Sequence, residues 1–340
     1  MPSVILLVLS ALLLGGCAEQ ASVVELSGST MGTRYSIKLV ELPPGLSADA
    51  LQTQIDARLE QVNDLMSTYR PASALSRFNA SPSTDWQDAD PALVDLIALA
   101  QTITARSTGA FDVTVGPLVN LWGFGPDEHP FVVPDEPTLA LMRARVGSDK
   151  LETRLDPPAL RKTHPDLDVD LSGIAKGHGV DEVAALLDRL GVAAYLVEIG
   201  GELRAKGRKG EDRPWRIAIE RPDPSARVPY RVVPLVDIAL ATSGDYRNVY
   251  VRDGKHYSHT IDPSTGRPVE HSLASVTVLA PDCASADAWA TALLVLGPER
   301  GVALAEAEGL AAFFVTRDGE DFSDRATTAF ARLVPAETAH

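Results

Sequence analysis

The chain has 340 residues, of which 45% are hydrophobic and 23% are charged. This composition is ordinary for a soluble globular protein, and the length can bury the core of one large domain or two closely packed ones. The formal net charge of -15 argues against a nucleic-acid-binding protein, because that class needs a basic surface to neutralise phosphates. An anionic ligand would have to be held by local hydrogen-bond donors or by a bridging metal ion.

The chain starts with an apolar run over Met1–Leu14, which is shorter than the roughly 20 residues of a membrane-spanning helix. Its length suits the apolar region of a secretory signal, although no Lys or Arg precedes it. The run ends in Leu-Gly-Gly before Cys17, which resembles a lipobox. Residues 1–17 are therefore predicted to be a lipoprotein signal peptide that is lipidated at Cys17; the alternative is an ordinary signal with an unmodified cysteine. Cys283, the other cysteine, would then have no disulfide partner.

Hydrophobic periodicity predicts the elements that follow. Residues 18–30 are predicted to be a tether, and residues 31–335 the folded region. The segment 120–165 is rich in Pro, Gly and charge, and it is predicted to be mostly loops. Strands are predicted over 34–40, 167–171, 194–199, 215–220, 235–240, 246–251, 273–280 and 311–316, and helices over 49–66, 91–106, 137–145, 175–190, 284–296 and 299–308. Strands and helices do not alternate regularly, which favours an α+β fold with mixed or antiparallel sheets and packed helices.

Asp287 and Thr291 are four residues apart in a predicted helix, so their side-chain oxygens lie on one face about one turn apart. A carboxylate and a hydroxyl are hard oxygen ligands that suit Mg²⁺ or Ca²⁺, but they are too few for a complete protein cage. Mg²⁺ commonly keeps water molecules and takes phosphate oxygens as its remaining ligands. From the spacing alone, a helix cap and a packed threonine are the simpler interpretation.

A glycine-rich segment from Asp168 to Gly179 is predicted to run from a strand through a turn into a helix. Its glycines would let backbone groups approach a ligand, and the helix start would offer the positive end of its dipole to a phosphate. The segment matches neither the Walker loop nor the G-x-G-x-x-G motif, so a structural turn with a solvated Lys176 is an equal alternative.

His259 lies just before an Asp-Pro-Ser-Thr-Gly turn sequence at 262–266. Its imidazole could act as a general base near neutral pH, although a lone histidine is more often packed or solvated. The segments 29–33 and 109–126 combine apolar and small residues. They could line the pocket of a flat aromatic ligand, or they could simply form core and turns.

Taken in this order, the motifs resemble the ApbE family, the FAD:protein FMN transferases. The resemblance covers nearly the whole chain after the signal, from about Ser29 to Thr316, and all the motifs are in register. It rests on Ser-Thr-Met-Gly-Thr at 29–33, Met-Ser-Thr-Tyr-Arg at 66–70, Phe-Asp-Val-Thr-Val-Gly-Pro-Leu at 111–118, Asp-Leu-Ser-Gly-Ile-Ala-Lys-Gly at 170–177, Gly-Gly-Glu-Leu-Arg at 200–204, Ala-Thr-Ser-Gly-Asp at 241–245, His-Thr-Ile-Asp-Pro at 259–263 and Ala-Asp-Ala-Trp-Ala-Thr at 286–291.

The resemblance implies an ApbE-like, T-fold-related architecture and a site for FAD and Mg²⁺. The implied magnesium ligands are Asp287, Thr291 and a backbone oxygen near Gly173. The implied FAD contacts are Met31, Tyr69, Ala110, Phe111, Asp112, Asp170, Lys176 and Ile261. The implied reaction is attack by an acceptor protein's threonine hydroxyl on the FMN-side phosphorus of FAD, with AMP as the leaving group. His259 is our candidate for the base that accepts the hydroxyl proton.

Two alternative functions are compatible with the same site. Water in place of the threonine would make an FAD pyrophosphatase that yields FMN and AMP, and no turnover at all would make a periplasmic FAD-binding lipoprotein. The resemblance implies acceptors that are subunits of ion-pumping flavin oxidoreductases. It therefore favours a lipid anchor in the inner membrane, on its periplasmic side, although Ala18 and Glu19 after Cys17 leave the outer membrane open.

Overall fold

The computed structural model describes residues 23–126, 131–210, 212–223, 228–246, 249–252, 255–319 and 321–335, so the predicted signal peptide and Cys17 lie outside the described residues. The strands are β1 (Val24–Thr30), β2 (Thr33–Leu39), β3 (Gln87–Asp88), β4 (Leu151–Leu155), β5 (Pro158–Lys162), β6 (Tyr195–Ile199), β7 (Glu202–Lys206), β8 (Trp215–Glu220), β9 (Pro229–Leu235), β10 (Ile238–Gly244), β11 (Val249–Arg252), β12 (Lys255–Ser258), β13 (Ile261–Asp262), β14 (Arg267–Pro268), β15 (Leu273–Ala280), β16 (Ala311–Asp318) and β17 (Asp321–Ala326). The helices are α1 (Ala48–Met66), α2 (Ala74–Ala80), α3 (Pro91–Arg106), α4 (Gly116–Leu121), α5 (Glu136–Arg143), α6 (Ala175–Arg189), α7 (Cys283–Ala307) and α8 (Thr328–Leu333), with short 3-10 turns at Val113–Val115 and Ser148–Lys150.

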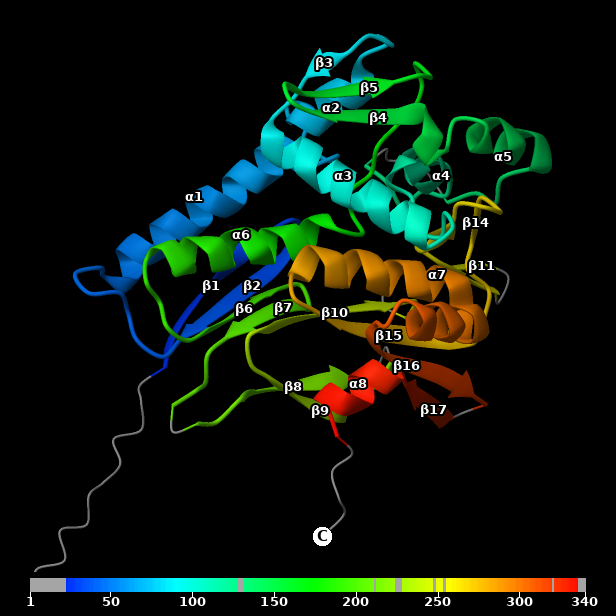
Figure 1. The fold of residues 1–340 in the computed structure, drawn as a ribbon. Helices are drawn as coiled ribbons and strands as arrows, with labels where there is room; N and C mark the ends of the chain where they lie inside the picture. The colour runs from blue at the N-terminus through cyan, green and yellow to red at the C-terminus, as the bar shows by residue number, and fades with distance from the viewer. Residues whose placement is uncertain are drawn as a thin grey trace, which may run out of the picture.

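The central element is an eight-stranded sheet in the order β1-β2-β6-β7-β10-β15-β16-β17, and every adjacent pair in it is antiparallel. Helices α1, α6 and α7 lie on one face of this sheet, while the β8–β9 ribbon and α8 lie on the other (Figure 1). The predicted α+β class with antiparallel sheets and packed helices is therefore confirmed. Among the described residues, no helix is both long and apolar enough to cross a membrane.

The predicted tether is wrong from residue 24 onward, because that segment forms β1 and pairs along its whole length with β2. Leu26 is buried in the core beneath α1, and the backbone of Gly28 lies against the ring of Tyr35. A Cβ at Gly28 would come within 2.6 Å of that ring. The short polar residues of this segment give no clear strand pattern, because the strand is stabilised by packing against its neighbour β2.

The predicted strand over 167–171 is also wrong, since this segment joins no sheet. A side chain takes the place of a partner strand: Asn79 Nδ2 donates to Val169 O and Val169 N donates to Asn79 Oδ1, each at 2.9 Å. The buried ammonium of Lys162 donates to Asn79 O at 2.7 Å and to Leu167 O at 3.3 Å. The segment is thus extended and fixed, which explains its strand-like pattern.

Two further predictions need correction. The segment 120–165 contains α5 as predicted, but also the β4–β5 hairpin, which forms a three-stranded sheet with β3. The strand predicted over 235–240 straddles the turn between β9 and β10, where Asp237 has a φ of 51°. By contrast, the two helices predicted over 284–296 and 299–308 are confirmed as the two halves of α7, which is broken at Gly297 with a φ of 79°.

Helices α6 and α7 cap one another. Asp287 of α7 accepts a hydrogen bond from Gly177 N at 3.1 Å, while Asp181 of α6 accepts from Cys283 N at 2.8 Å and from Ala284 N at 2.9 Å. Each carboxylate therefore satisfies N–H groups at the other helix's start, where the dipole also favours negative charge. A Cβ at Gly177 would lie 2.3 Å from Cys283 O, so this glycine serves helix packing inside α6 and not the predicted turn.

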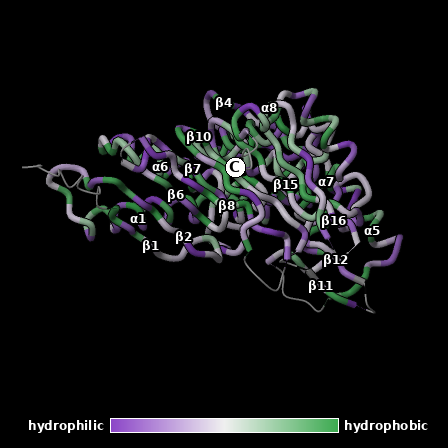
Figure 2. The backbone as a smooth tube through the Cα atoms, turned by 90° about the horizontal axis from the view of Figure 1, so that it is seen from below, coloured by the Kyte–Doolittle hydropathy of each residue, from purple (hydrophilic) through white to green (hydrophobic). Residues whose placement is uncertain are grey.

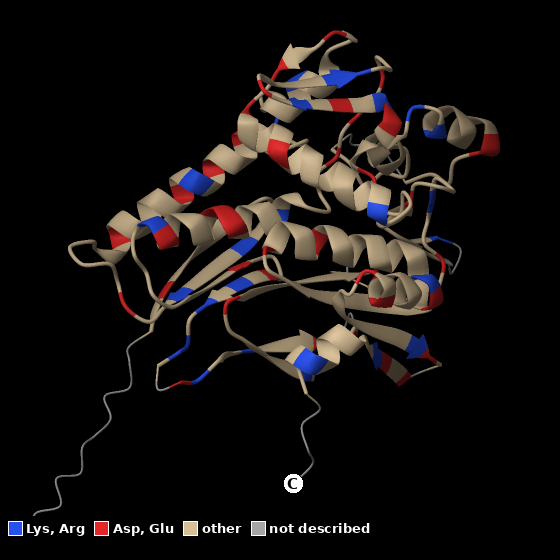
Figure 3. Cartoon of the chain, in the orientation of Figure 1, with Lys and Arg blue, Asp and Glu red and all other residues tan. Residues whose placement is uncertain are grey.

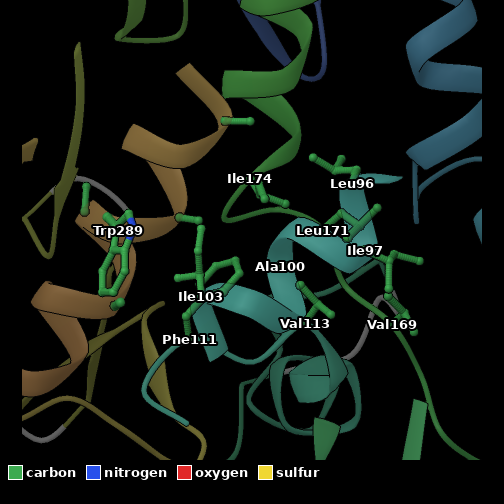
Figure 4. Close-up of a cluster of buried hydrophobic side chains, with 14 of the residues drawn as sticks. Leu96, Ile97, Ala100, Ile103, Phe111, Val113, Val169, Leu171, Ile174 and Trp289 are labelled. Carbon is green, nitrogen blue, oxygen red and sulfur yellow. The ribbon is translucent and has the colours of Figure 1, made fainter. Parts of the chain in front are cut away.

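Hydrophobic side chains fill both faces of the sheet. Those of α3, the segment 169–174 and α7 point toward one another in the largest cluster, which includes Ile97, Phe111 and Trp289 (Figure 4). A separate cluster packs the other face of the sheet against β8, β9 and α8. Hydrophobic residues lie mainly along the packed strands and helices, with hydrophilic ones toward the periphery (Figure 2). Acidic and basic residues are interspersed along the helices and strands in this view (Figure 3).

Candidate active site

A cavity of about 1260 Å³ opens at the end of the large sheet where β6 and β10 end and β7 and β15 begin. Residues that are far apart in the sequence meet here, because the strand order brings β2, β6, β7 and β10 side by side. Its lining contains every predicted site residue of the described chain: Met31, Tyr69, Ala110, Phe111, Asp112, Asp170, Gly173, Lys176, His259, Ile261, Asp287 and Thr291. The structure thus brings the predicted FAD and metal residues together, while their roles remain predictions.

Three charged residues in the lining form one cluster. Lys176 Nζ lies 2.6 Å from Glu202 Oε1 and 3.8 Å from Asp287 Oδ1. Glu202 is 2% exposed and Asp287 is 3% exposed. Two buried carboxylates therefore share one ammonium group, which leaves an excess of negative charge when both are ionised.

The pKa values follow from this arrangement. Burial raises the pKa of Glu202 to about 7, and the nearby Lys176 ammonium opposes this shift. Burial also raises the pKa of Asp287, against the opposing effects of Lys176 and the Gly177 N–H. For Lys176 burial acts against the charged form, but the carboxylates of Asp287 and Glu202 outweigh it and raise the pKa. Lys176 is therefore a cation at neutral pH.

Thr291, one helical turn after Asp287 in α7, has neighbours from β10 and from the segment before α6. Thr291 Oγ1 is 3.1 Å from Ser243 Oγ at the end of β10. A Cβ at Gly173 would lie 3.3 Å from Thr291 Oγ1 and 3.1 Å from the Phe111 ring, so only glycine brings the backbone this close without displacing a neighbour. The described residues contain no group of three or more His, Cys, Asp and Glu side chains that could hold a metal ion. A metal at Asp287 would have to draw its other ligands from hydroxyl and backbone oxygens, water and substrate.

Apolar residues form another wall of the cavity. Met31 lies in the β1–β2 turn with a φ of 48°, a left-handed value that is uncommon for a residue with a side chain. Phe111 and Ile261 are buried and also line the cavity. Tyr69 is 65% exposed at the cavity edge, where its hydroxyl donates to Phe124 O at 3.4 Å. An aromatic ring system could therefore be enclosed on one side and remain open on the other.

Asp112 holds the local chain and does not extend its carboxylate toward a ligand. Its Oδ1 accepts from Thr114 N at 2.8 Å and from Thr114 Oγ1 at 2.7 Å, and its Oδ2 accepts from Ser148 N at 3.2 Å. Burial raises the pKa of this carboxyl, and the Thr114 N–H opposes the shift. A ligand contact at Asp112 would therefore use the backbone.

His259 follows β12 directly and is half-buried in the lining. Its ring lies edge-on to Phe124, with 6.3 Å between the ring centroids. The imidazole therefore has an aromatic neighbour and also lines the cavity. A base for a hydroxyl group that enters the cavity could occupy this position.

Sequence reasoning assigned no role to Glu202 or Ser243. Both stand in motifs that carried the family resemblance, Gly-Gly-Glu at 200–202 and Ala-Thr-Ser-Gly at 241–244. The available signal was their position at a strand end next to glycine, where side chains of adjacent strands converge. Their contact with Lys176 and Thr291 depends on the strand order, which the local pattern does not contain.

Comparisons with known proteins agree on one family. A sequence model of the ApbE family matches residues 31–314. A FAD:protein FMN transferase of Vibrio cholerae is 47% identical over 321 residues, which is 94% of this chain and 96% of that protein. The solved flavin transferase ApbE of Vibrio cholerae superposes with a TM-score of 0.85 at 46% identity, covering 92% of this chain and all of that one. The apo flavinyl transferase ApbE of Pseudomonas stutzeri gives a TM-score of 0.85 at 44% identity, covering 93% and 98% of the two chains.

Proposed function

This chain belongs to the ApbE family, and on that premise we propose that it transfers the FMN half of FAD to a threonine hydroxyl of an acceptor protein. One observation carries the proposal: a single cavity brings together the motifs that carried the family resemblance. Its lining holds the charged residues Lys176, Glu202 and Asp287 for a pyrophosphate, apolar residues for a ring system, and His259. The alternatives, hydrolysis by water and storage of FAD, are not favoured, because the relatives that match nearly the whole chain are transferases.

The reaction breaks the phosphoanhydride bond of FAD and forms a phosphoester bond to the threonine. The threonine oxygen attacks the phosphorus on the FMN side, the bond from that phosphorus to the bridging oxygen breaks, and AMP leaves with the bridging oxygen. The hydroxyl proton passes to His259 Nδ1 or Nε2, since a neutral imidazole is well matched to this task near pH 7. Lys176, held by Glu202, faces the cavity as a cation that can pair with pyrophosphate oxygens.

The residues present fit a magnesium ion that is shared with the substrate. The buried carboxylates outnumber the ammonium group, and Glu202 Oε2 is buried without a hydrogen-bond partner among the described residues. Asp287, Thr291 and the Gly173 backbone oxygen would hold the ion. When bound, Mg²⁺ would neutralise the pyrophosphate oxygens and the charge on the departing AMP.

The test replaces one carboxylate without changing its shape. Asp287→Asn should lower magnesium-dependent transfer by at least about a hundredfold, because loss of a charged ligand removes several kcal/mol of charge stabilisation. Asp282→Asn is the matched control: it removes the same charge at the start of the same helix, where the side chain caps Ser285 N outside the cavity. Equal activity of the two variants would contradict the metal assignment.

We also propose a lipid anchor at Cys17 that holds the protein on the periplasmic side of the inner membrane. The lipobox-like sequence supports the anchor. The family resemblance supports acceptors that are subunits of ion-pumping flavin oxidoreductases, which would share that membrane. Cys17→Ser should move the protein from the membrane fraction to the soluble periplasmic fraction; a variant that stays with the membrane would contradict the anchor.

A further inference from the structure

We propose that the acceptor protein presents its threonine on an extended segment that binds as an added strand along the outer edge of β8. This inference rests on the proposed function, because it assumes that the second substrate is a polypeptide. It identifies where that polypeptide enters and which part of it is recognised.

The cavity has an arm that the predicted FAD and metal residues do not line. This arm lies on the opposite face of the large sheet, and its lining includes Ser36 and Lys38 of β2, Leu196 of β6 and the consecutive residues 217–220 of β8. The total volume of about 1260 Å³ exceeds the roughly 300–1,000 Å³ of ordinary small-molecule pockets. The cavity therefore has room for a second substrate beside FAD.

The β8 strand presents its backbone edge to this arm. Successive side chains of a strand point to opposite faces, so four consecutive residues can line one cavity only when the strand edge borders it. Among the described residues, β8 forms a ladder with β9 alone. The side chain of Ile219 packs in one cluster with Leu196 and Leu203, so one face of β8 covers β6 and β7.

The position of Pro234 in β9 indicates which β8 residue directs its N–H and C=O away from β9. Arg216 pairs with Pro234, and proline has no N–H to give, so this pair is of the type that exchanges no backbone hydrogen bonds. Ala218 pairs with Val232 two residues further along and belongs to the same type. The N–H and C=O of Ala218 therefore point away from β9 into the arm, and its small exposed side chain leaves the approach open.

Side chains of β9 contact other elements, while residues of β8 line the cavity. Arg231 of β9 donates to Val334 O after α8 at 3.3 Å, and the ring of Tyr230 is tilted against that of Phe313 of β16, with 6.3 Å between the ring centroids. The β8 strand also runs toward the active-site end of the sheet: its first residue, Trp215, donates to Lys206 O at the far end of β7, and Glu220 at its other end lines the cavity. A segment added to β8 would run toward the end of the sheet, where Gly200 and Gly201 between β6 and β7 line the same cavity as Lys176.

Recognition by backbone makes a specific prediction for the acceptor. An added strand alternates between residues whose N–H faces β8 and residues whose N–H faces away, and this is the pattern of peptide recognition by strand addition. The probe is an acceptor peptide selected by mass from a pool with a central threonine and randomised flanks, incubated with the wild-type protein, FAD and Mg²⁺. Backbone N-methylation at successive positions should reduce transfer at every second residue, by about tenfold, and leave the residues between them unaffected.

A variant of the protein provides the second measurement. Ala218→Pro removes the outward N–H and should raise the KM for the peptide by about tenfold with an unchanged KM for FAD. Ala218→Val keeps the N–H and should behave as wild type. An N-methylation profile without period two, or a peptide KM that Ala218→Pro leaves unchanged, would overturn the inference. Failure of the wild type to modify any peptide in the pool, and any purified candidate acceptor subunit, would instead overturn the proposed function.

Discussion

At the scale of single residues, the site depends on a charge balance that no local motif contains. Lys176 opens a helix and Glu202 opens a strand, and each is unremarkable in its own segment. Only the fold places them 2.6 Å apart beside Asp287. The sequence therefore allowed a prediction of which residues act on FAD, but it could not indicate that a second buried carboxylate holds the lysine.

The buried carboxyl of Glu202 predicts a pH-dependent stability. Its pKa is raised from 4.5 to about 7 in the folded state, so the folded protein keeps a proton that the unfolded chain loses above pH 4.5. This contribution to the unfolding free energy is fully present below pH 4.5 and is lost as the pH rises through about 7. The total loss is up to about 3 kcal/mol, because one unit of pKa difference corresponds to about 1.36 kcal/mol. Urea unfolding without ligands should show this loss for the wild type and a flatter profile for Glu202→Gln. Parallel profiles would refute the assignment.

His259 gives a prediction about chemistry and not about binding. His259→Ala should lower kcat for transfer by about a hundred- to ten-thousandfold, since a positioned base supplies that range, while FAD affinity stays near the wild-type value. Stopped-flow titration of FAD fluorescence and the transfer rate separate the two effects. A variant with intact FAD binding and a wild-type transfer rate would exclude His259 as the base.

At the scale of elements, the long helices could be predicted well and the irregular active-site segment could not. Leu51, Ile55 and Leu59 repeat at helical spacing and are buried on one face of α1 as expected. The segment 167–171 has the pattern of a strand, yet it bonds to the side chains of Lys162, five residues before Leu167, and of Asn79, 90 residues before Val169. A hydrophobic sequence pattern indicates that a segment is buried and extended. It does not indicate which group forms hydrogen bonds with the backbone N–H and C=O.

We therefore expect Asn79 to hold in place the segment that carries Asp170 and Gly173. Asn79→Ala leaves the N–H and C=O of Val169 without their side-chain partner and should cost about 2 kcal/mol of unfolding free energy. It should also weaken FAD binding, because the loosened segment lines the cavity. Thr102→Ala is the control, since that exposed hydroxyl bonds only within α3 to Ala98 O at 3.0 Å. Similar stability of both variants would contradict the bracing role of Asn79.

At the scale of the whole molecule, the fold class could be predicted from the irregular order of strands and helices along the chain. The order of the strands within the large sheet could not. The pairing of β2 with β6 joins Tyr35 to Ile199, and the pairing of β10 with β7 joins Leu240 to Leu203. These non-local pairs close the cavity around residues from Met31 to Thr291, so the site is a property of the complete fold. Most of the family motifs lie where an element begins or ends at that cavity, whereas Asp287 and Thr291 lie within α7.

The most direct test of the account is mass analysis of an acceptor after incubation with this protein, FAD and Mg²⁺. The probe is a purified candidate acceptor subunit, and the same subunit with its modified threonine replaced by alanine is the control. The account predicts covalent FMN on the threonine-bearing subunit alone, with one AMP released for each FMN attached. Free FMN and AMP without an adduct, or unchanged FAD, would contradict transfer as the function of this chain.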